Sequence, residues 1–535
     1  MLKYPPMLSL LSPTLILLVG AALTLAAGMF AKQRSQPIRW LLLLIVTVSL
    51  AITWLGHDTD TVDLISWTPY ETITPTLSLS SSDIQIPLYT SALIAVAAII
   101  LFTLLKDKSE QEANSGFGAV ILIFAVLAFW VGLSSTNLFT LVLAWTVFDI
   151  TSLLAIARAA DTSRSDYLGA SVTYIVATIV STTVLWLAAI GMQANHLSQN
   201  IDQLVFNQRW IGIAVLAAGL IRLAPYPFHI GQRVISRVVN EKITQAFALQ
   251  LASPALGAIL IARTSTYIEL PGLVELILGT VLVTGLVAGA VVTVIPSDYR
   301  KSVNYVLTMQ SGLIALVLLA NCAGCDANEI GTLILAGTSL MIFLQVEQGT
   351  FAGSLAATLA MLGIAGIPLS WAAMSRIQLL DAWMNSGRGL WMFLYSGAMT
   401  LTVAAMGRVI ITSLPSTKSN ILKPRDLALI LPAFSLFLHS SNLSGANATI
   451  WLAICLPVVL GISIAFLTTS IDPAYKRLVG NAADLISLEW LHKVAKRVIA
   501  LLRRILAIVD DVLAGEGALL WLLAIAIVGW LLVRR

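Results

Sequence analysis

Residues 219–230 read GLIRLAPYPFHI and carry a charged residue inside an otherwise apolar stretch. Arg222 stands five positions before Pro227, the first residue of a Pro-Phe-His sequence. A proline inside a spanning helix interrupts its hydrogen bonding, and the freed backbone groups tolerate water and a charge in mid-membrane. We therefore predict a broken membrane helix over 210–228 that buries a positive charge.

The composition of the whole chain points to lipid as its solvent. The 535 residues are 58% hydrophobic and 11% charged, with a mean hydropathy of +0.90. A spanning helix needs about 20 apolar residues, and runs of that length recur along nearly the whole sequence. This excludes an enzyme-sized soluble domain and predicts an all-α integral membrane protein. The first run, 8–30, lacks a convincing cleavage site and is interpreted as a retained span rather than a signal peptide.

Loop charges predict how the spans are oriented. The loops after spans one, three, five, seven and nine carry Lys or Arg, whereas the loop after span two is acidic. Basic loops stay on the cytoplasmic side, so both termini are predicted outside, in a multi-pass protein of a prokaryotic inner membrane. Hydropathy places sixteen spans, at 8–30, 38–56, 86–105, 117–134, 136–158, 167–193, 210–228, 244–263, 272–295, 302–321, 328–346, 353–374, 387–411, 426–440, 448–469 and 517–533.

Residues 472–515 depart from this pattern. They alternate apolar and basic positions at helical spacing and are too polar to span a bilayer. We interpret them as an amphipathic helix that lies along the cytoplasmic surface. The alternative is a solvated linker, but a linker would not keep Leu485, Leu488 and Leu491 near one face.

The sequence offers little for a metal or a cofactor. Cys322 and Cys325 form a CAGC motif without a second ligand pair, so a local disulfide or two incidental thiols is the preferred interpretation. There is no phosphate-binding glycine loop, no haem or iron–sulfur cysteine pattern and no nucleotide fingerprint. We expect no cofactor, no metal and no nucleic-acid partner.

Three stretches together resemble the antiporter-like subunits of respiratory complex I and of the related multisubunit cation/proton antiporters. The first is GLIRLAPYPFHI, where that family has a lysine in place of Arg222. The second is SDYRKSVNYVLTMQSGLIALVLL from Ser297, which includes Lys301. The third is GIAGIPLSWAAMSR, with Pro368 as the helix breaker and Arg376 where a lysine usually stands.

The resemblance implies a fold and an assembly. It implies broken helices 7 and 12, two inverted-repeat halves at 117–265 and 272–411, N-terminal spans within 1–116, and a C-terminal part at 412–535 that contains the surface helix. It also implies other membrane subunits as partners in a multisubunit complex. The chain would be a non-redox subunit of a proton-translocating oxidoreductase or of an antiporter.

The sequence departs from the family at most of its charged positions. The Trp-Glu pair of span five corresponds to Trp145 and Thr146, and the nearest acid, Asp149, lies one helical turn further along. The lysine of span eight corresponds to Ala255, and the histidine and lysine of span eleven to Gly337 and Met341. The remaining charges are arginines, which stay protonated where a buried lysine can release a proton.

The candidate residues for ion translocation are Asp149, Arg222, His229 and Arg376, and Thr146, Pro227, Pro368 and Lys301 would support them. Ionisable residues in mid-membrane are functional by default. The alternative is that Asp149 and Arg222 form a structural bridge that only fixes helix packing.

Three functions remain open. The first is a proton- or ion-translocating subunit of a complex I-like or antiporter-like assembly. The second is a scaffold that has lost conduction, which the missing lysines favour. The third is the membrane subunit of an inorganic-carbon uptake system, which only the partner proteins would distinguish.

Overall fold

The computed structural model describes most of the chain up to the last predicted span. All of the described residues belong to one compact unit, Met1–Pro473. They are 6–30, 35–55, 61–66, 76–80, 85–105, 115–159, 165–195, 197–198, 200–201, 209–229, 247–268, 270–294, 299–320, 326–345, 350–412, 424–438 and 447–468. The predicted surface helix at 472–515, the predicted span at 517–533, and Cys322 and Cys325 lie outside these ranges.

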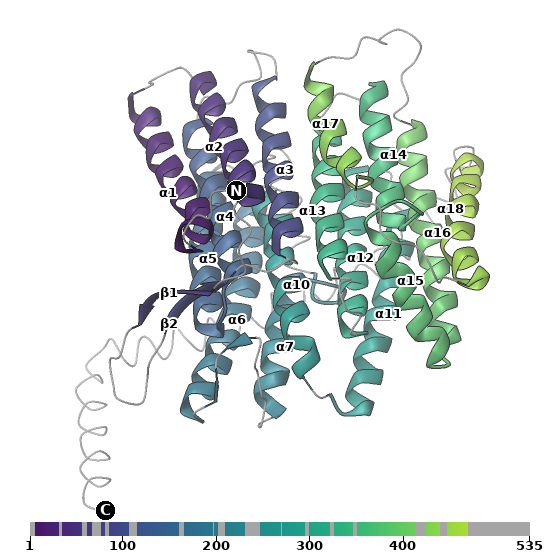
Figure 1. Cartoon of the computed structure of the whole chain (residues 1–535). Helices are drawn as coiled ribbons and strands as arrows, with labels where there is room; N and C mark the ends of the chain where they lie inside the picture. Colours follow the sequence, from purple (N-terminus) through teal and green to yellow (C-terminus); the bar gives the residue numbers. More distant parts are fainter. Residues whose placement is uncertain are drawn as a thin grey trace, which may run out of the picture. The chain divides into compact units, whose positions relative to one another are not determined.

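The unit is almost entirely helical (Figure 1). Its first helices are α1 (Pro6–Phe30), α2 (Ser35–Leu55), α3 (Gln85–Leu104), α4 (Ser115–Ser134), α5 (Leu138–Ala159), α6 (Ser165–Ala194) and α7 (Arg209–Leu223). The chain continues with a π-helical turn (Phe247–Ala252), α10 (Ser253–Thr264), a short 3₁₀ turn (Ser265–Tyr267), α11 (Gly272–Val294), α12 (Tyr299–Leu319) and α13 (Asp326–Phe343). The last described helices are α14 (Phe351–Ala365), α15 (Ala372–Asn385), α16 (Gly389–Thr412), α17 (Pro424–Ser435) and α18 (Ala448–Thr468).

The helices confirm an integral multi-pass membrane protein. Within the described ranges, nine helical segments are long and apolar enough to cross a membrane, by length and composition. Every predicted span from 8–30 to 448–469 coincides with helix in the structure. The sidedness of the termini stays a prediction.

Two predicted spans are shorter or less regular than expected. The span predicted over 210–228 ends as a helix at Leu223, and Ala224 has a positive φ of 56°. The span predicted over 353–374 is interrupted after Ala365, where Gly366 has φ 72°, and helix resumes as α15. A proline follows each helix end within a few residues and cannot continue a regular helix, so both breaks expected from the resemblance are present.

A small β-hairpin was not predicted. Strands β1 (Thr61–Ser66) and β2 (Thr76–Ser80) pair antiparallel, with Thr61 opposite Ser80. Its residues belong to the acidic loop predicted after span two. Leu79 is buried, packs against Val131 and forms a β-bridge with Ser135, so β2 contacts the connection between α4 and α5.

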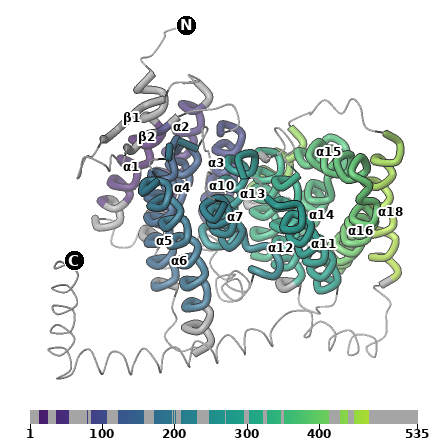
Figure 2. Tube along the Cα trace, turned by 90° about the horizontal axis from the view of Figure 1, so that it is seen from below, coloured from purple at the N-terminus to yellow at the C-terminus, as the bar shows by residue number. Residues whose placement is uncertain are grey.

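The middle of the unit brings α10 against α7. Figure 2 shows both helices between α5 and α6 on one side and α12 and α13 on the other. A Cβ atom at Gly257 of α10 would lie 2.5 Å from the backbone nitrogen of Leu223 and 2.7 Å from the carbonyl oxygen of Gly219. Small residues permit this close backbone contact between membrane helices. The contact fixes α7 at the turn that carries Arg222.

Candidate functional site

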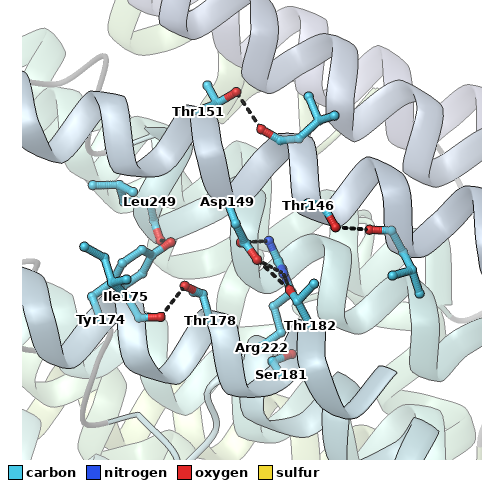
Figure 3. A network of polar contacts seen from close by, with 12 residues as sticks. Thr146, Asp149, Thr151, Tyr174, Ile175, Thr178, Ser181, Thr182, Arg222 and Leu249 are labelled. Carbon is cyan, nitrogen blue, oxygen red and sulfur yellow. Dashed lines mark hydrogen bonds and ion pairs between the residues drawn. The ribbon is translucent and has the colours of Figure 1, made fainter. Parts of the chain in front are cut away.

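Asp149 of α5 and Arg222 of α7 form a buried ion pair (Figure 3). Arg222 Nη2 lies 2.7 Å from Asp149 Oδ1, and Arg222 Nη1 lies 3.5 Å from Asp149 Oδ2. Thr182 of α6 completes the cluster: its hydroxyl donates to Asp149 Oδ2 at 2.5 Å and accepts from Arg222 Nη1 at 3.0 Å. Three helices therefore contribute to one set of charge-assisted hydrogen bonds. We call Asp149, Thr182 and Arg222 the first charge cluster.

Aromatic rings surround the cationic side of this cluster. The guanidinium carbon of Arg222 lies 4.3 Å from the ring centroid of Trp145 and 5.3 Å from that of Phe148. Cation–π contacts of desolvated groups contribute about 2 kcal/mol. The Arg222 side chain is fully buried, whereas that of Asp149 is 12% exposed. The acid is thus the member of the pair that reaches the surface of the chain.

Helix packing holds Arg222 in place from two sides. The Ser181 hydroxyl of α6 donates to the carbonyl oxygen of Ala218, one turn before Arg222 on α7, at 2.8 Å. On the other side, Gly257 of α10 contacts the same stretch of α7. An ionised side chain at the bilayer centre costs about 2.5–3.5 kcal/mol on insertion scales, and the pairing with Asp149 offsets part of that cost.

The candidate His229 and the supporting residues Thr146 and Pro227 lie on the two segments that carry the ion pair. Thr146 stands one turn before Asp149 on α5, and Pro227 and His229 follow the end of α7. The Thr146 hydroxyl donates to the carbonyl oxygen of Val142 at 2.8 Å and accepts from Trp186 Nε1 at 3.4 Å. His229 is buried beyond the break and stacks on Tyr226, with ring centroids 5.0 Å apart. Pro227 lies between these two residues and is half-buried.

Arg376 lies in a second cluster, with an acid that the sequence analysis missed. Arg376 Nη1 of α15 lies 3.0 Å from Glu329 Oε1 of α13, and both side chains are fully buried. Gln310 of α12 donates to Glu329 Oε2 at 2.9 Å and accepts from Arg376 Nη2 at 3.2 Å. The Ser375 hydroxyl also donates to Glu329. We call Gln310, Glu329, Ser375 and Arg376 the second charge cluster.

The break between α14 and α15 makes room for the Arg376 side chain. Arg376 Nη2 donates to the carbonyl oxygen of Ile364 at 3.3 Å, in the last turn of α14, where carbonyls lack intrahelical partners. A Cβ atom at Gly366 would lie 2.5 Å from Arg376 Cγ, and the φ of 72° at this position favours glycine. Pro368, the predicted helix breaker, follows this αL turn by two residues. The side chain of Lys301 lies outside the described part of the structure.

Tightly packed hydrocarbon occupies the positions where the resemblance implies further ionisable residues. Ala255 and Met341 are buried. A Cβ atom at Gly337 of α13 would lie 2.4 Å from Leu251 Cδ2 and 3.2 Å from Leu307 Cδ2. Leucine side chains therefore fill the space in which a histidine at this position would stand.

The signals for the second cluster were present but weak. Glu329 stands at the start of the predicted span 328–346, where an acid is usually solvated. Gln310 is an uncharged polar residue inside the predicted span 302–321. Glu329 lies outside the three quoted motifs, and Gln310 lies within the second of them. Among the described residues, no group of three or more His, Cys, Asp or Glu side chains is arranged to hold a metal ion.

Comparison with known proteins adds one informative likeness. No protein-family model and no curated protein matches the sequence. Among solved structures, a chain in the structure of the Mrp complex from Dietzia sp. DQ12-45-1b matches with a TM-score of 0.77 over 97% of the present chain. The chain shares the fold of this Mrp complex chain. At 16% identity the likeness concerns the fold alone, and the present chain covers 63% of the length of the Mrp chain.

The likeness confirms the antiporter-like membrane fold expected from the three motifs. It does not address the charged residues, because so few positions are identical. The roles of Asp149, Arg222, His229 and Arg376 therefore depend on the geometry of this chain.

Proposed function

We propose that this chain is a membrane-embedded, ion-translocating subunit of a multisubunit assembly of the antiporter-like or complex I-like kind. The observation that carries the proposal is the Asp149–Arg222 pair, which lies among membrane helices at the end of a broken helix. Such pairs are costly to bury, and intramembrane ionisable residues mark ion pathways. The Mrp-like fold supports a place among other membrane subunits.

In the two clusters, the side chains that can take up and release a proton are the carboxylates of Asp149 and Glu329. Arginine stays protonated in proteins, so Arg222 and Arg376 act as fixed positive charges. Addition of a proton to Asp149 would neutralise its carboxylate and remove its attraction for Arg222. Asp149 is 12% exposed, whereas Glu329 is fully enclosed, so Asp149 is the group that a proton or a partner subunit reaches first.

The positions of the two clusters agree with the proposed inverted repeat. Asp149 is the twelfth residue of α5, and Gln310 is the twelfth residue of α12. Arg222 and Arg376 flank the two helix breaks. We assign 117–265 and 272–411 to the two halves, each with one arginine held between three helices.

A second candidate function is a scaffold subunit that does not conduct. The packing of Leu251 over Gly337 favours it, because this hydrocarbon lies where a charge relay would connect the two halves. Within α10, the single charged residue is Arg263, in the last turn. Nothing in the geometry favours an inorganic-carbon uptake system over these two, so the co-purifying partners decide that alternative.

The test begins with the native assembly. The chain is purified from native membranes in mild detergent, the co-purifying subunits are identified, and the assembly is reconstituted into vesicles to measure ion flux. Asp149→Asn and Arg222→Ala are compared with Asp381→Asn, a carboxylate at the end of α15 that accepts a hydrogen bond from Asn385 at 3.1 Å.

We expect flux to fall in Asp149→Asn and Arg222→Ala and to persist in Asp381→Asn. If all three assemblies form and transport ions like the unmodified one, the chain is a scaffold. Failure of Asp149→Asn to assemble would be resolved with Thr182→Val, which keeps both charges and removes one hydroxyl that bonds Asp149.

A further inference from the structure

A separate cavity of about 320 Å³ lies at one end of the second half. Its wall is formed by α7, by the segment after α10 and by the start of α11. The ends of α12 and α15 and the start of α16 complete it. None of its lining residues belongs to either charge cluster. Much of its wall is aliphatic, including Leu216, Leu278, Leu316 and Leu319. Its volume is near the lower end of small-molecule sites, about 300–1,000 Å³.

An ion pair lies in the wall of this cavity. Arg388 Nη2 donates to Glu275 Oε1 at 2.9 Å, and the two side chains are 33% and 46% exposed. This bond uses one nitrogen of the guanidinium and one oxygen of the carboxylate. A guanidinium has five N–H donors and a carboxylate has two oxygens, so each partner retains capacity for a ligand. Together they offer a donor site for an anion beside an acceptor site for a cation.

Aromatic residues give this wall a fixed shape. The guanidinium carbon of Arg388 lies 4.7 Å from the ring centroid of Trp391, and Trp391 meets Trp383 edge to face at 5.8 Å. A Cβ atom at Gly279 would lie 2.4 Å from Trp391, so α11 is hollowed where the indole lies. Tryptophan is enriched at membrane–water interfaces, which agrees with the position of this cavity at helix ends.

Apolar surface continues from the helices that form the cavity. Leu273 and Ile277 of α11 are exposed, as are Leu390 and Phe393 at the start of α16. The two helices pack against each other. The acyl chains of an amphiphile whose polar end occupies the cavity would therefore contact the exposed faces of α11 and α16.

We propose that this cavity binds a zwitterionic phospholipid whose headgroup carries a phosphate and a primary ammonium. The phosphate binds the free N–H donors of Arg388, the ammonium binds the free oxygen of Glu275, and the glycerol end of the lipid contacts Trp383 and Trp391. The Arg388–Glu275 pair carries opposite charges side by side, which is the complement of such a headgroup. This site is independent of ion translocation.

The test measures lipid retention on the full chain by native mass spectrometry. The protein is delipidated, exposed in turn to phosphatidylethanolamine, phosphatidylglycerol and phosphatidylcholine, and compared with Arg388→Gln and Glu275→Gln. Arg408→Gln, near the C-terminal end of the helix α16 that Arg388 immediately precedes, is the control.

Phosphatidylethanolamine should bind best, because the quaternary ammonium of phosphatidylcholine has no N–H donor and phosphatidylglycerol has no cation. Loss of one charge-assisted bond should lower retention of phosphatidylethanolamine by about tenfold in either variant. Phosphatidylglycerol should respond to Arg388→Gln alone. Equal retention of the three lipids, or the same retention in both variants as in Arg408→Gln, overturns the proposal.

A cavity-filling variant keeps the test decisive if a charge variant fails to fold. Ala320→Phe adds a large side chain to the cavity wall without changing either charge, and Leu187→Phe changes an exposed residue of α6, outside the proposed site, as its control. We expect Ala320→Phe alone to lose bound lipid. A protein subunit cross-linked at Arg388 in the native assembly, with no lipid retained there, would also overturn the proposal.

Discussion

At the residue scale, each buried arginine of the two clusters is matched by one acid and by neutral hydrogen-bonding side chains. Arg222 has Asp149 and Thr182, and Arg376 has Glu329 and Gln310. Because arginine keeps its proton, removal of either acid leaves a permanent charge without its counter-charge. The clusters should therefore behave as coupled units rather than as sums of single bonds.

A double-mutant cycle tests this coupling in the first cluster. Asp149→Leu and Arg222→Met should each lower the free energy of unfolding by roughly 3–5 kcal/mol, because each leaves a buried charge without its partner. The double variant should lose much less than the sum, because it removes both charges. Unfolding in mixed detergent micelles gives the three values. A double variant as unstable as the sum of the single ones would show that the two residues are not coupled.

The acids of the two clusters should differ in their contribution to stability. Glu329→Gln should destabilise the chain more than Asp149→Asn, because the Glu329 side chain is fully buried and that of Asp149 is 12% exposed. The midpoint of thermal unfolding in detergent, with Asp381→Asn as the control, gives the order. An equal shift of the unfolding midpoint in both variants would show that the burial of the acid does not set its contribution to stability.

At the element scale, the two helix breaks place the arginines. Arg222 lies in the last turn of α7, before its break, whereas Arg376 is the fifth residue of α15, beyond its break, and its side chain bonds the carbonyl oxygen of Ile364 in the last turn of α14. The free carbonyls at a helix end would otherwise lack partners in lipid. The second break therefore supplies both space and a carbonyl acceptor for the charge of Arg376.

Gly366 tests the geometry of the second break. Gly366→Ala should destabilise the chain by roughly 1–2 kcal/mol from the left-handed backbone alone, and by more because the new Cβ would lie 2.5 Å from Arg376 Cγ. Gly397→Ala, in α16 with open space around it, should be neutral or stabilising. Thermal unfolding of both variants gives the comparison. Equal stability of the two alanine variants would refute the account of the break.

Much of the arrangement of helices along the chain could be predicted from the sequence. Hydropathy located the helices up to 448–469, and proline marked both breaks. The ends of α7 and α14 were misjudged, because the backbone leaves the helix at Ala224 and Gly366, before Pro227 and Pro368. The hairpin of β1 and β2 was missed, because its strands are short, six and five residues, and alternate polar and apolar residues within a loop that contains several acids.

Only one of the two charge clusters could be predicted from the sequence. Asp149 and Arg222 could be linked in advance because the resemblance placed both on helices that meet. Glu329 and Arg376 are 47 positions apart, and no local periodicity connects them. Contacts between distant helices depend on how the whole unit packs, which a single sequence does not specify.

At the scale of the whole molecule, the two clusters belong to one Mrp-like fold but are separated by hydrocarbon around α10 and α13. Asp149→Asn and Glu329→Gln should therefore be additive, with the double variant within about 0.5 kcal/mol of the sum. Unfolding of the single and double variants under one condition measures this. A coupling energy well above that limit would indicate a connection between the halves.

The central claim is that Asp149 takes part in ion movement within an assembly. The most direct measurement is ion flux through vesicles that contain the purified native assembly, compared between Asp149→Asn and Asp381→Asn at equal subunit content. We expect flux to fall to background in Asp149→Asn alone. Undiminished flux in a fully assembled Asp149→Asn complex would contradict it and leave the chain as a scaffold.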